Sequence, residues 1–198
     1  MVRIVVCMTG ATGAIYGVRL LELLAEMGVE RHLVLSKWAQ VTLLEETPHD
    51  LDYVRRLATR VYSDADQAAP ISSGSFRHDG VVIAPCSMKT LAGIRIGYAD
   101  NLIIRAADVA LKEQRRLVLM VRETPLNAIH LENMLFAARA GAIIFPAMPA
   151  FYHRPQSVDD IVNQSVGRLL DLFGLDAPRL PRWRGLAGDS DIPETGEK

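Results

Sequence analysis

Short aliphatic runs recur along the chain and alternate with longer segments whose apolar residues repeat at helical spacing. The runs have the length of buried strands and lie at residues 3–8, 32–35, 80–84, 116–121 and 142–145. The helical spacing occurs in residues 15–27, 101–112, 128–140 and 158–173. Because strands and helices alternate, the pattern predicts an α/β fold with a mostly parallel sheet and right-handed crossovers.

Length and charge narrow this picture further. The chain has 198 residues, enough for one well-buried domain and short for two. We expect that domain in residues 1–175, followed by a tail at 176–198 that is rich in proline, glycine and charge. The net charge of −1 argues against a surface that binds nucleic acid.

The apolar opening and the cysteines indicate the compartment. Residues 4–8 are too short for a membrane span and lack the features of a secretory signal, so we expect a cytoplasmic protein without a membrane partner. Cys7 lies in the first predicted strand, and Cys86 follows Pro85. Their spacing fits no zinc site, so both cysteines are expected to be reduced, with Cys7 in the core.

Small and hydroxyl-bearing residues follow three of the predicted strands. Residues 9–14 form a glycine-containing turn that is neither a dinucleotide fingerprint nor a P-loop. Ser36 and Lys37 follow the second strand, and residues 85–90 follow the third. Each segment alone is also explained by a tight turn or a helix cap. Together they favour a cradle for a mononucleotide, and flavin mononucleotide (FMN) fits, because it needs a phosphate nest and an apolar slot.

A charged pair, Arg122 and Glu123, directly follows the fourth aliphatic run. The carboxyl end of a buried parallel strand is where an open α/β sheet holds a ligand. Pro125 and Asn127 then open a helix, whose N–H groups favour an anion. The alternative is a structural ion pair between the two side chains.

A further group of cations suggests a second anion. Arg105 and Lys112 share a face of one predicted helix, with Asp108 placed to pair with Lys112. A solvated, salt-bridged face is the alternative.

Three later residues could complete that anion site. Arg168 borders an apolar helix stripe, Tyr152 follows the fifth strand, and Trp183 lies in the tail. Each has a structural alternative: a surface arginine, a wedge under a loop and a tail anchor.

Taken together, these segments resemble the UbiX-like flavin prenyltransferases, including those associated with phenolic acid decarboxylases. The resemblance covers nearly the whole chain, from Met8 to about Trp183. It rests on ordered motifs such as Pro85-Cys86-Ser87-Met88-Lys89-Thr90-Leu91, and these lie at residues 9–14, 72–76, 85–91, 105–109, 111–113, 122–125, 130–134 and 149–152. It implies a single-domain, Rossmann-like (flavodoxin-like) three-layer sandwich.

The resemblance also implies an activity and its participants. The family joins a dimethylallyl group from dimethylallyl phosphate to reduced FMN, at N5 and C6. The product is prenylated FMN, which UbiD-like decarboxylases use, and no metal is needed. A homododecamer with sites at subunit interfaces is implied as well. The sequence leaves open whether the donor is the monophosphate or the diphosphate.

Residue roles follow by position from the resemblance. The residues implied to bind FMN are Gly10, Ala11, Thr12, Ser36, Ser87, Met88, Lys89, Thr90 and Arg122. Those implied to bind the allylic phosphate are Arg105, Lys112, Tyr152 and Arg168. Glu46, Glu123, Lys112 and Trp183 are implied to be catalytic. We assign Glu46 to accept the ring proton and Glu123 to pass one to the departing phosphate.

Two positions depart from the family, and two other functions compete with this one. Thr12 and Asn127 stand where the family often has serine. One rival is an FMN-dependent cysteine-type decarboxylase, whose motifs match residues 125–130 and 36–38 less well. The other is a non-catalytic subunit that carries flavin, which would have no use for Glu123, Lys112 and Arg168.

Overall fold

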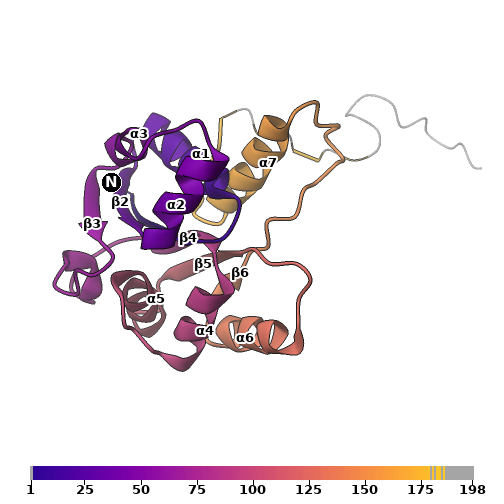
Figure 1. Cartoon of the computed structure of the whole chain (residues 1–198). Coiled ribbons are helices and arrows are strands. Elements are labelled where there is room, and N and C mark those ends of the chain that lie inside the picture. The colour runs from indigo at the N-terminus through magenta and orange to yellow at the C-terminus, as the bar shows by residue number, and fades with distance from the viewer. Residues whose placement is uncertain (1, 179, 181, 184, 186–198) are drawn as a thin grey trace, which may run out of the picture.

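A six-stranded parallel sheet runs through the part of the chain that the structure describes (Figure 1). The structure is a computed structural model, and it describes residues 2–178, 180, 182, 183 and 185. The strands are β1 Arg3–Met8, β2 Glu30–Leu35, β3 Arg60–Ser63, β4 Gly80–Cys86, β5 Arg116–Val121 and β6 Ile143–Ile144. Their order across the sheet is β3-β2-β1-β4-β5-β6, and each neighbouring pair is parallel.

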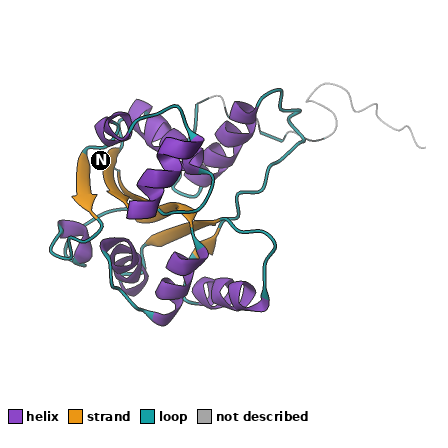
Figure 2. Ribbon diagram, viewed as in Figure 1, coloured by secondary structure: helices purple, strands orange, loops and turns teal. Residues whose placement is uncertain are grey.

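Helices cover both faces of this sheet (Figure 2). They are α1 Ala14–Glu26, α2 Lys37–Glu46, α3 Leu51–Arg56, α4 Met88–Ile96, α5 Leu102–Lys112, α6 Ala128–Arg139 and α7 Val158–Asp171. The first three and α7 pack on one face, and α4, α5 and α6 pack on the other. The predicted flavodoxin-like three-layer sandwich is confirmed. Among the described residues, no helix is both long and apolar enough to cross a membrane.

Strand β1 supplies the centre of both cores because its side chains alternate between the two faces. Ile4, Val6 and Met8 pack toward α1 and α7, whereas Val5 and Cys7 pack toward α4 and α5. All five are fully buried or nearly so. Both cysteines are free, and burial raises the pKa of the Cys86 thiol to about 12. The thiol therefore stays protonated.

The hydrophobic pattern does not predict several elements of the structure, among them β3, α2, α3 and α4. Strand β3 at residues 60–63 is a four-residue edge strand with Val61 44% exposed. An edge strand has no buried aliphatic run to reveal it. For α2 the sequence indicates only a helix cap at Ser36, and for α3 it gives no signal. Helix α2 presents Trp38, Val41 and Leu44 outward, so its apolar residues do not form one buried stripe.

The start of the predicted tail lies against α7. Gly167 has no side chain, and a Cβ there would lie 2.6 Å from Cδ1 of Leu180. Arg182 pairs with Asp171 of α7 at 2.8 Å. The segment after Leu175 is therefore held to the domain where it is described, and most of the predicted tail lies outside the described residues.

A buried histidine lies at the amino edge of the sheet, just before β4. His78 is 8% exposed, and burial, reinforced by Arg115, lowers its pKa to about 4. Its folded pKa lies below the usual 6.5. His78 therefore contributes stability above about pH 6.5, and this contribution is lost as the pH falls toward 4.

We predict a free energy of unfolding that falls by up to about 1.4 kcal/mol per pH unit across that window through His78 alone. Denaturant unfolding of His78→Phe and the parent chain at several pH values isolates this contribution, and the variant should show a flatter dependence. His49→Gln is the control, because His49 is only partly buried. Parallel curves for His78→Phe and the parent would contradict the prediction.

Candidate functional site

The carboxyl end of β1 lies between those of β2 and β4, where the strand order reverses direction. Such a switch point is where open α/β sheets bind ligands. Thr9 joins the two strand ends, because its hydroxyl donates to the Pro85 carbonyl at 2.8 Å and accepts from the Ser87 N–H at 2.8 Å. Sequence reasoning missed this role of Thr9, which holds the turn after β1 against the turn after β4.

A cavity of about 240 Å³ opens at this point. Its lining includes Gly10, Ser36, Ser87, Lys89 and Thr90, which are all residues predicted to bind FMN. The other lining residues are Thr9, Lys37, Trp38, Asp64, Asn101 and Ile103. Cavities that enclose a whole small ligand measure roughly 300–1,000 Å³, so this one encloses only part of a mononucleotide.

Two helices begin at the cavity. Ser36 caps α2 by accepting from the Ala39 N–H at 3.1 Å, and Ser87 caps α4 by accepting from the Thr90 N–H at 3.3 Å. The remaining N–H groups of each first turn, with Lys37 and Lys89 beside them, form an environment that favours an anion. The predicted caps are therefore real, and they line the same cavity that the predicted cradle requires.

The turn after β1 is shaped by a close contact and by a distant carboxylate. A Cβ at Gly10 would collide with Trp38, so only glycine fits there. Gly13 has a positive φ of 97° and offers α1 no side-chain cap. Glu46, at the end of α2, takes that role by accepting from the N–H groups of Gly13 at 2.7 Å and Ala14 at 3.1 Å.

The other predicted FMN ligands lie beside the cavity and not in its lining. Ala11 and Thr12 continue the turn after Gly10, and Met88 is the first residue of α4. Arg122 is exposed at the end of β5, where its N–H donates to the Cys86 carbonyl at 3.2 Å. Glu123 accepts from the N–H of Thr124 at 3.0 Å.

No ion pair joins Arg122 and Glu123, which both lie in the described part of the chain. The structural alternative for this dipeptide is therefore not realised. Both residues are exposed at the edge of the sheet where the cavity opens.

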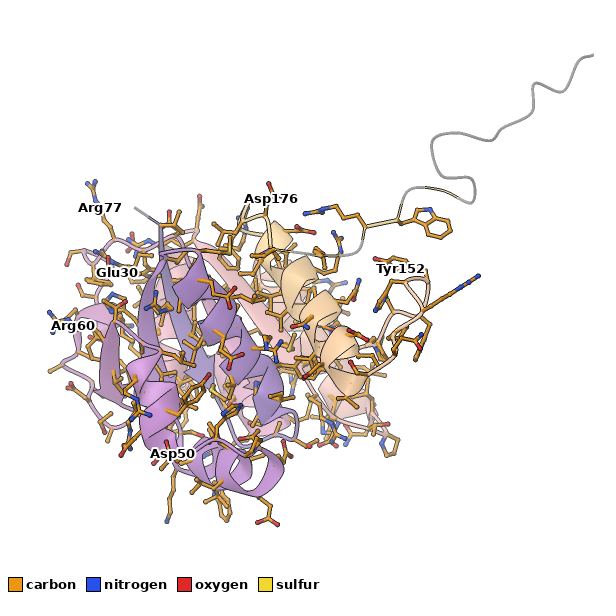
Figure 3. All side chains as sticks on the ribbon, turned by 90° about the horizontal axis from the view of Figure 1, so that it is seen from above. Glu30, Asp50, Arg60, Arg77, Tyr152 and Asp176 are labelled. Atoms are coloured by element: carbon orange, nitrogen blue, oxygen red, sulfur yellow. The ribbon has the colours of Figure 1, made fainter. Side chains whose placement is uncertain are left out.

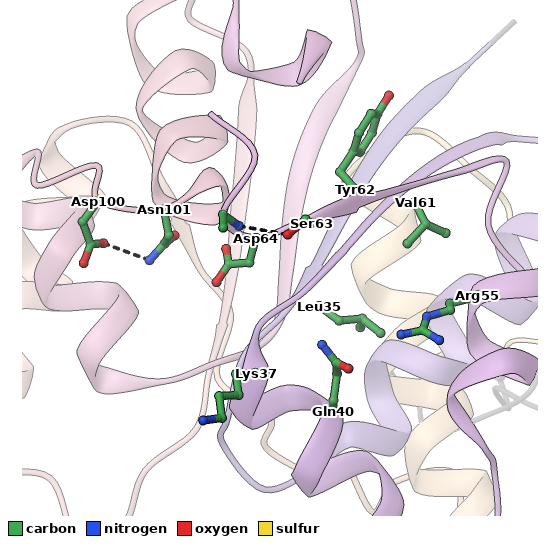
Figure 4. A pocket seen from close by; sticks show the side chains of 11 residues that line it. Leu35, Lys37, Gln40, Arg55, Val61, Tyr62, Ser63, Asp64, Asp100 and Asn101 are labelled. Atoms are coloured by element: carbon green, nitrogen blue, oxygen red, sulfur yellow. Dashed lines mark hydrogen bonds between the residues drawn. The ribbon is translucent and has the colours of Figure 1, made fainter. Parts of the chain in front are cut away.

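Asp64 lines this cavity and also a larger neighbouring one of about 550 Å³, which Figure 4 shows; Lys37 and Asn101 line both cavities as well. Its carboxylate accepts from the N–H of Ile103 at 3.3 Å, at the start of α5. Burial raises the pKa of Asp64 above its usual value. Sequence reasoning did not single out Asp64 or Asn101, and only the Asn101 cap of α5 had a local signal.

Neither Arg105 nor Lys112 lines this cavity, and of the two Lys112 lies far from it. Helix α5 starts at Leu102, next to Asn101 in the cavity lining, and its last residue, Lys112, lies about 15 Å further along the axis at 1.5 Å per residue. The Arg105 guanidinium donates to the Ser72 carbonyl at 3.0 Å and pairs with Asp108 at 2.6 Å. The predicted pair between Asp108 and Lys112 is therefore wrong. Arg105 lies one turn before Asp108, and Lys112 pairs with its own neighbour Glu113.

Tyr152, Arg168 and Trp183 form a second group around α7. The Tyr152 hydroxyl accepts from the buried Gln164 amide at 3.0 Å, and the Trp183 ring meets the Tyr152 ring edge-on, with centroids 5.8 Å apart. Arg168 pairs with Asp171 at 2.5 Å. Figure 3 shows Tyr152 on the opposite side of the molecule from Arg77, which follows the 72–76 segment. Helices α5 and α7 pack on opposite faces of the sheet, so a single chain does not gather the four residues predicted to bind the allylic phosphate.

The residues present fit the phosphate end of FMN. Hydroxyls, two helix N-termini, two lysines and Gly10 line the cavity, and no cluster of metal-binding side chains occurs among the described residues. Such a donor set binds a phosphate through N–H and O–H donors.

Comparison with known proteins places this geometry in a family. The family model described as Flavoprotein matches residues 1–170. Flavin prenyltransferase PAD1, mitochondrial, of Saccharomyces cerevisiae is 59% identical over 187 residues, which are 93% of this chain and 76% of the relative. Flavin prenyltransferase UbiX of Thauera aromatica is 54% identical over 183 residues, covering 92% of this chain and 94% of the relative.

Solved structures that resemble this chain belong to the same group of proteins as these relatives. The crystal structure of AnUbiX (PadA1) in complex with FMN and dimethylallyl pyrophosphate has a TM-score of 0.93 and 57% identity, and covers 94% of this chain and 99% of that one. A dodecameric FMN-dependent UbiX-like decarboxylase from Escherichia coli O157:H7 has a TM-score of 0.91 and 59% identity, with 92% and 100% covered.

The bond from Glu46 to the start of α1 gives a stability prediction. Glu46→Ala should lower the free energy of unfolding by about 1 kcal/mol, because the N–H groups of Gly13 and Ala14 at the start of α1 lose their acceptor. Glu46→Gln should cost less, since the amide oxygen still accepts. Urea unfolding at fixed protein concentration measures both. The control is Glu45→Ala, one residue earlier on the exposed side of α2. Equal losses of stability at the two positions would contradict the capping role of Glu46.

Proposed function

The chain belongs to the UbiX-like flavin prenyltransferases, and we propose that it joins the dimethylallyl group of dimethylallyl phosphate to N5 and C6 of reduced FMN. The observation that carries this proposal is the cavity at the switch point, where Ser36, Ser87 and two helix N-termini suit the FMN phosphate. The prenylated FMN would serve a UbiD-like decarboxylase. We propose that the protein is a homododecamer, because its Escherichia coli relative is dodecameric.

The chain's own residues would contribute charge and proton transfer. Breaking the allylic C–O bond leaves a phosphate and a cation-like carbon, so Arg105, Lys112 and Arg168 are proposed to bind the departing phosphate. The rings of Tyr152 and Trp183, already in contact, would face the allyl group. FMN supplies the nucleophilic ring atoms when bound.

Two carboxylates are proposed to move protons. Forming the bond at C6 requires loss of a ring proton, and Glu46 would accept it. Glu46 lies at the turn that contains Thr12, held there by the N–H groups of Gly13 and Ala14. Glu123 would pass a proton to the phosphate from the end of β5.

The competing functions gain less support. Three solved decarboxylases, among them the FMN-dependent cysteine decarboxylase TvaF, share the fold at 19–24% identity, which supports the architecture alone. A flavin carrier would need the cavity to bind FMN, but it would have no use for the cations of α5 and α7.

The direct test uses the product. Incubating the protein with reduced FMN and dimethylallyl phosphate should yield released flavin whose mass has risen by one dimethylallyl unit. A parallel reaction with dimethylallyl pyrophosphate decides which donor is used, and oxidised FMN is the control. Unchanged flavin with both donors, despite bound FMN, would point to the carrier function.

The distance between Lys112 and the proposed FMN cavity leads to a second proposal. Lys112 lies at the amino edge of the sheet, whereas the FMN cavity opens at the carboxyl edge. We propose that a neighbouring copy supplies Arg105 and Lys112 to each cavity. The complete site would then be built from more than one chain.

Mixed assemblies test this arrangement. Ser87→Asp keeps a good helix cap but places a negative charge in the cradle, and Lys112→Ala removes the distant cation. Each variant alone should be nearly inactive. Co-expressed in equal amounts, they should regain about a quarter of the parent activity, because random assembly leaves that fraction of sites with both groups intact. No recovery in assemblies that contain both chains would show that one chain supplies the whole site.

A further inference from the structure

Two arginines hold the 72–76 segment, Arg105 near the start of α5 and Arg115 just after its end. The Arg105 guanidinium donates to the Ser72 carbonyl at 3.0 Å. The Arg115 guanidinium donates to the carbonyls of Gly74 and Phe76, each at 2.6 Å. The Arg115 side chain is only 17% exposed, and these two hydrogen bonds hold its guanidinium against the segment. The backbone of this segment therefore has a defined position relative to Lys112.

Gly74 brings that backbone directly against a charged pair. The Lys112 ammonium donates to one carboxylate oxygen of Glu113, and the other oxygen lies 4.0 Å from the Arg115 guanidinium. A Cβ at Gly74 would collide with the Glu113 carboxylate and would come within 2.7 Å of the Lys112 nitrogen. The hydrogen bond from Lys112 is the main reason that the pKa of Glu113 lies below its usual value. Glu113 is therefore a carboxylate that lies between two cations, and a side chain at position 74 would push this pair aside.

We propose that Glu113 is a positioning residue for prenyl transfer, which fixes the Lys112 ammonium in the direction of the donor phosphate. This inference rests on the proposed role of Lys112. A lysine side chain is flexible, and its ammonium carries three donors. One donor is used by Glu113, and the other two remain for the phosphate oxygens. Arg115 and the Gly74 backbone in turn hold Glu113.

The opposite role makes a different prediction. If Glu113 only neutralised Lys112 in the resting protein, phosphate would have to displace it. Removing the carboxylate would then strengthen binding of the donor. If Glu113 positions Lys112, removing it weakens both donor binding and turnover.

Two variants disturb the pair in different ways. Glu113→Gln removes the charge and keeps the shape, whereas Gly74→Ala pushes the pair aside sterically. With reduced FMN saturating, each should lower kcat/KM for dimethylallyl phosphate by about 10- to 100-fold, the usual cost of misplacing a group near the reaction. FMN affinity and the size of the assembly should not change. Glu26→Gln, at the exposed end of α1, is the control.

A double-mutant comparison separates positioning from a general structural role. In a Lys112→Ala background, Glu113→Gln and Gly74→Ala should have no further effect, because the group they position is absent. Calorimetry with inorganic phosphate on the FMN-loaded protein gives a readout that needs no turnover. There Glu113→Gln should lower the affinity about as much as Lys112→Ala does.

These experiments distinguish failure of the proposed function from failure of the positioning role of Glu113. A parent protein that binds FMN but makes no prenylated flavin overturns the proposed function, and the phosphate titration still decides the role of Glu113. Unchanged kcat/KM, tighter phosphate binding by Glu113→Gln, or an equal loss in the Lys112→Ala background each overturns the positioning role. Full activity of Lys112→Ala overturns it as well.

Discussion

Strand β1 pairs in parallel with β2 on one side and β4 on the other, and the location of the site depends on this pairing. Parallel strands end at the same edge, so the turns that leave β1, β2 and β4 meet there. Thr9 then joins the first and third of these turns through its hydroxyl. Small and hydroxyl-bearing residues that are far apart in the chain thus come to surround one cavity.

At this edge, the residues that start helices also form the binding surface. Ser36 and Ser87 cap α2 and α4 with their hydroxyls, which leaves other N–H groups of each first turn free to face an anion. Helix α1 lacks a cap of its own, and Glu46 from the end of α2 supplies one. The proposed proton acceptor is therefore held by the turn beside which it would act, so its substitution affects both stability and chemistry.

Helix α5 links the two edges of the sheet. It begins at Leu102, next to Asn101 in the lining of the cavity, and ends at Lys112, beside the 72–76 segment. A straight helix cannot return its last residue to the edge where it began. The cations at its far end are instead organised locally by Arg115, Glu113 and the absence of a side chain at Gly74. This arrangement favours a site shared between copies of the chain over one contained in a single chain.

The sequence by itself determined the elements whose burial leaves a periodic pattern. Strands β1 and β5 and helices α5 and α7 fall where their aliphatic runs or helical spacing indicate, and the caps at Ser36, Ser87 and Asn127 follow from residue type. Motif order also determined the family. The sequence did not predict edge strand β3, because half-exposed residues leave no such pattern.

Only the tertiary structure decided which residues meet. It brought Glu46 to the start of α1, placed Asp64 in the wall of the cavity and separated Lys112 from Ser87. These distances depend on how strands are ordered in the sheet and on which end of a helix a residue occupies. Local periodicity records whether a position is buried, but it carries no information about which distant segment buries it.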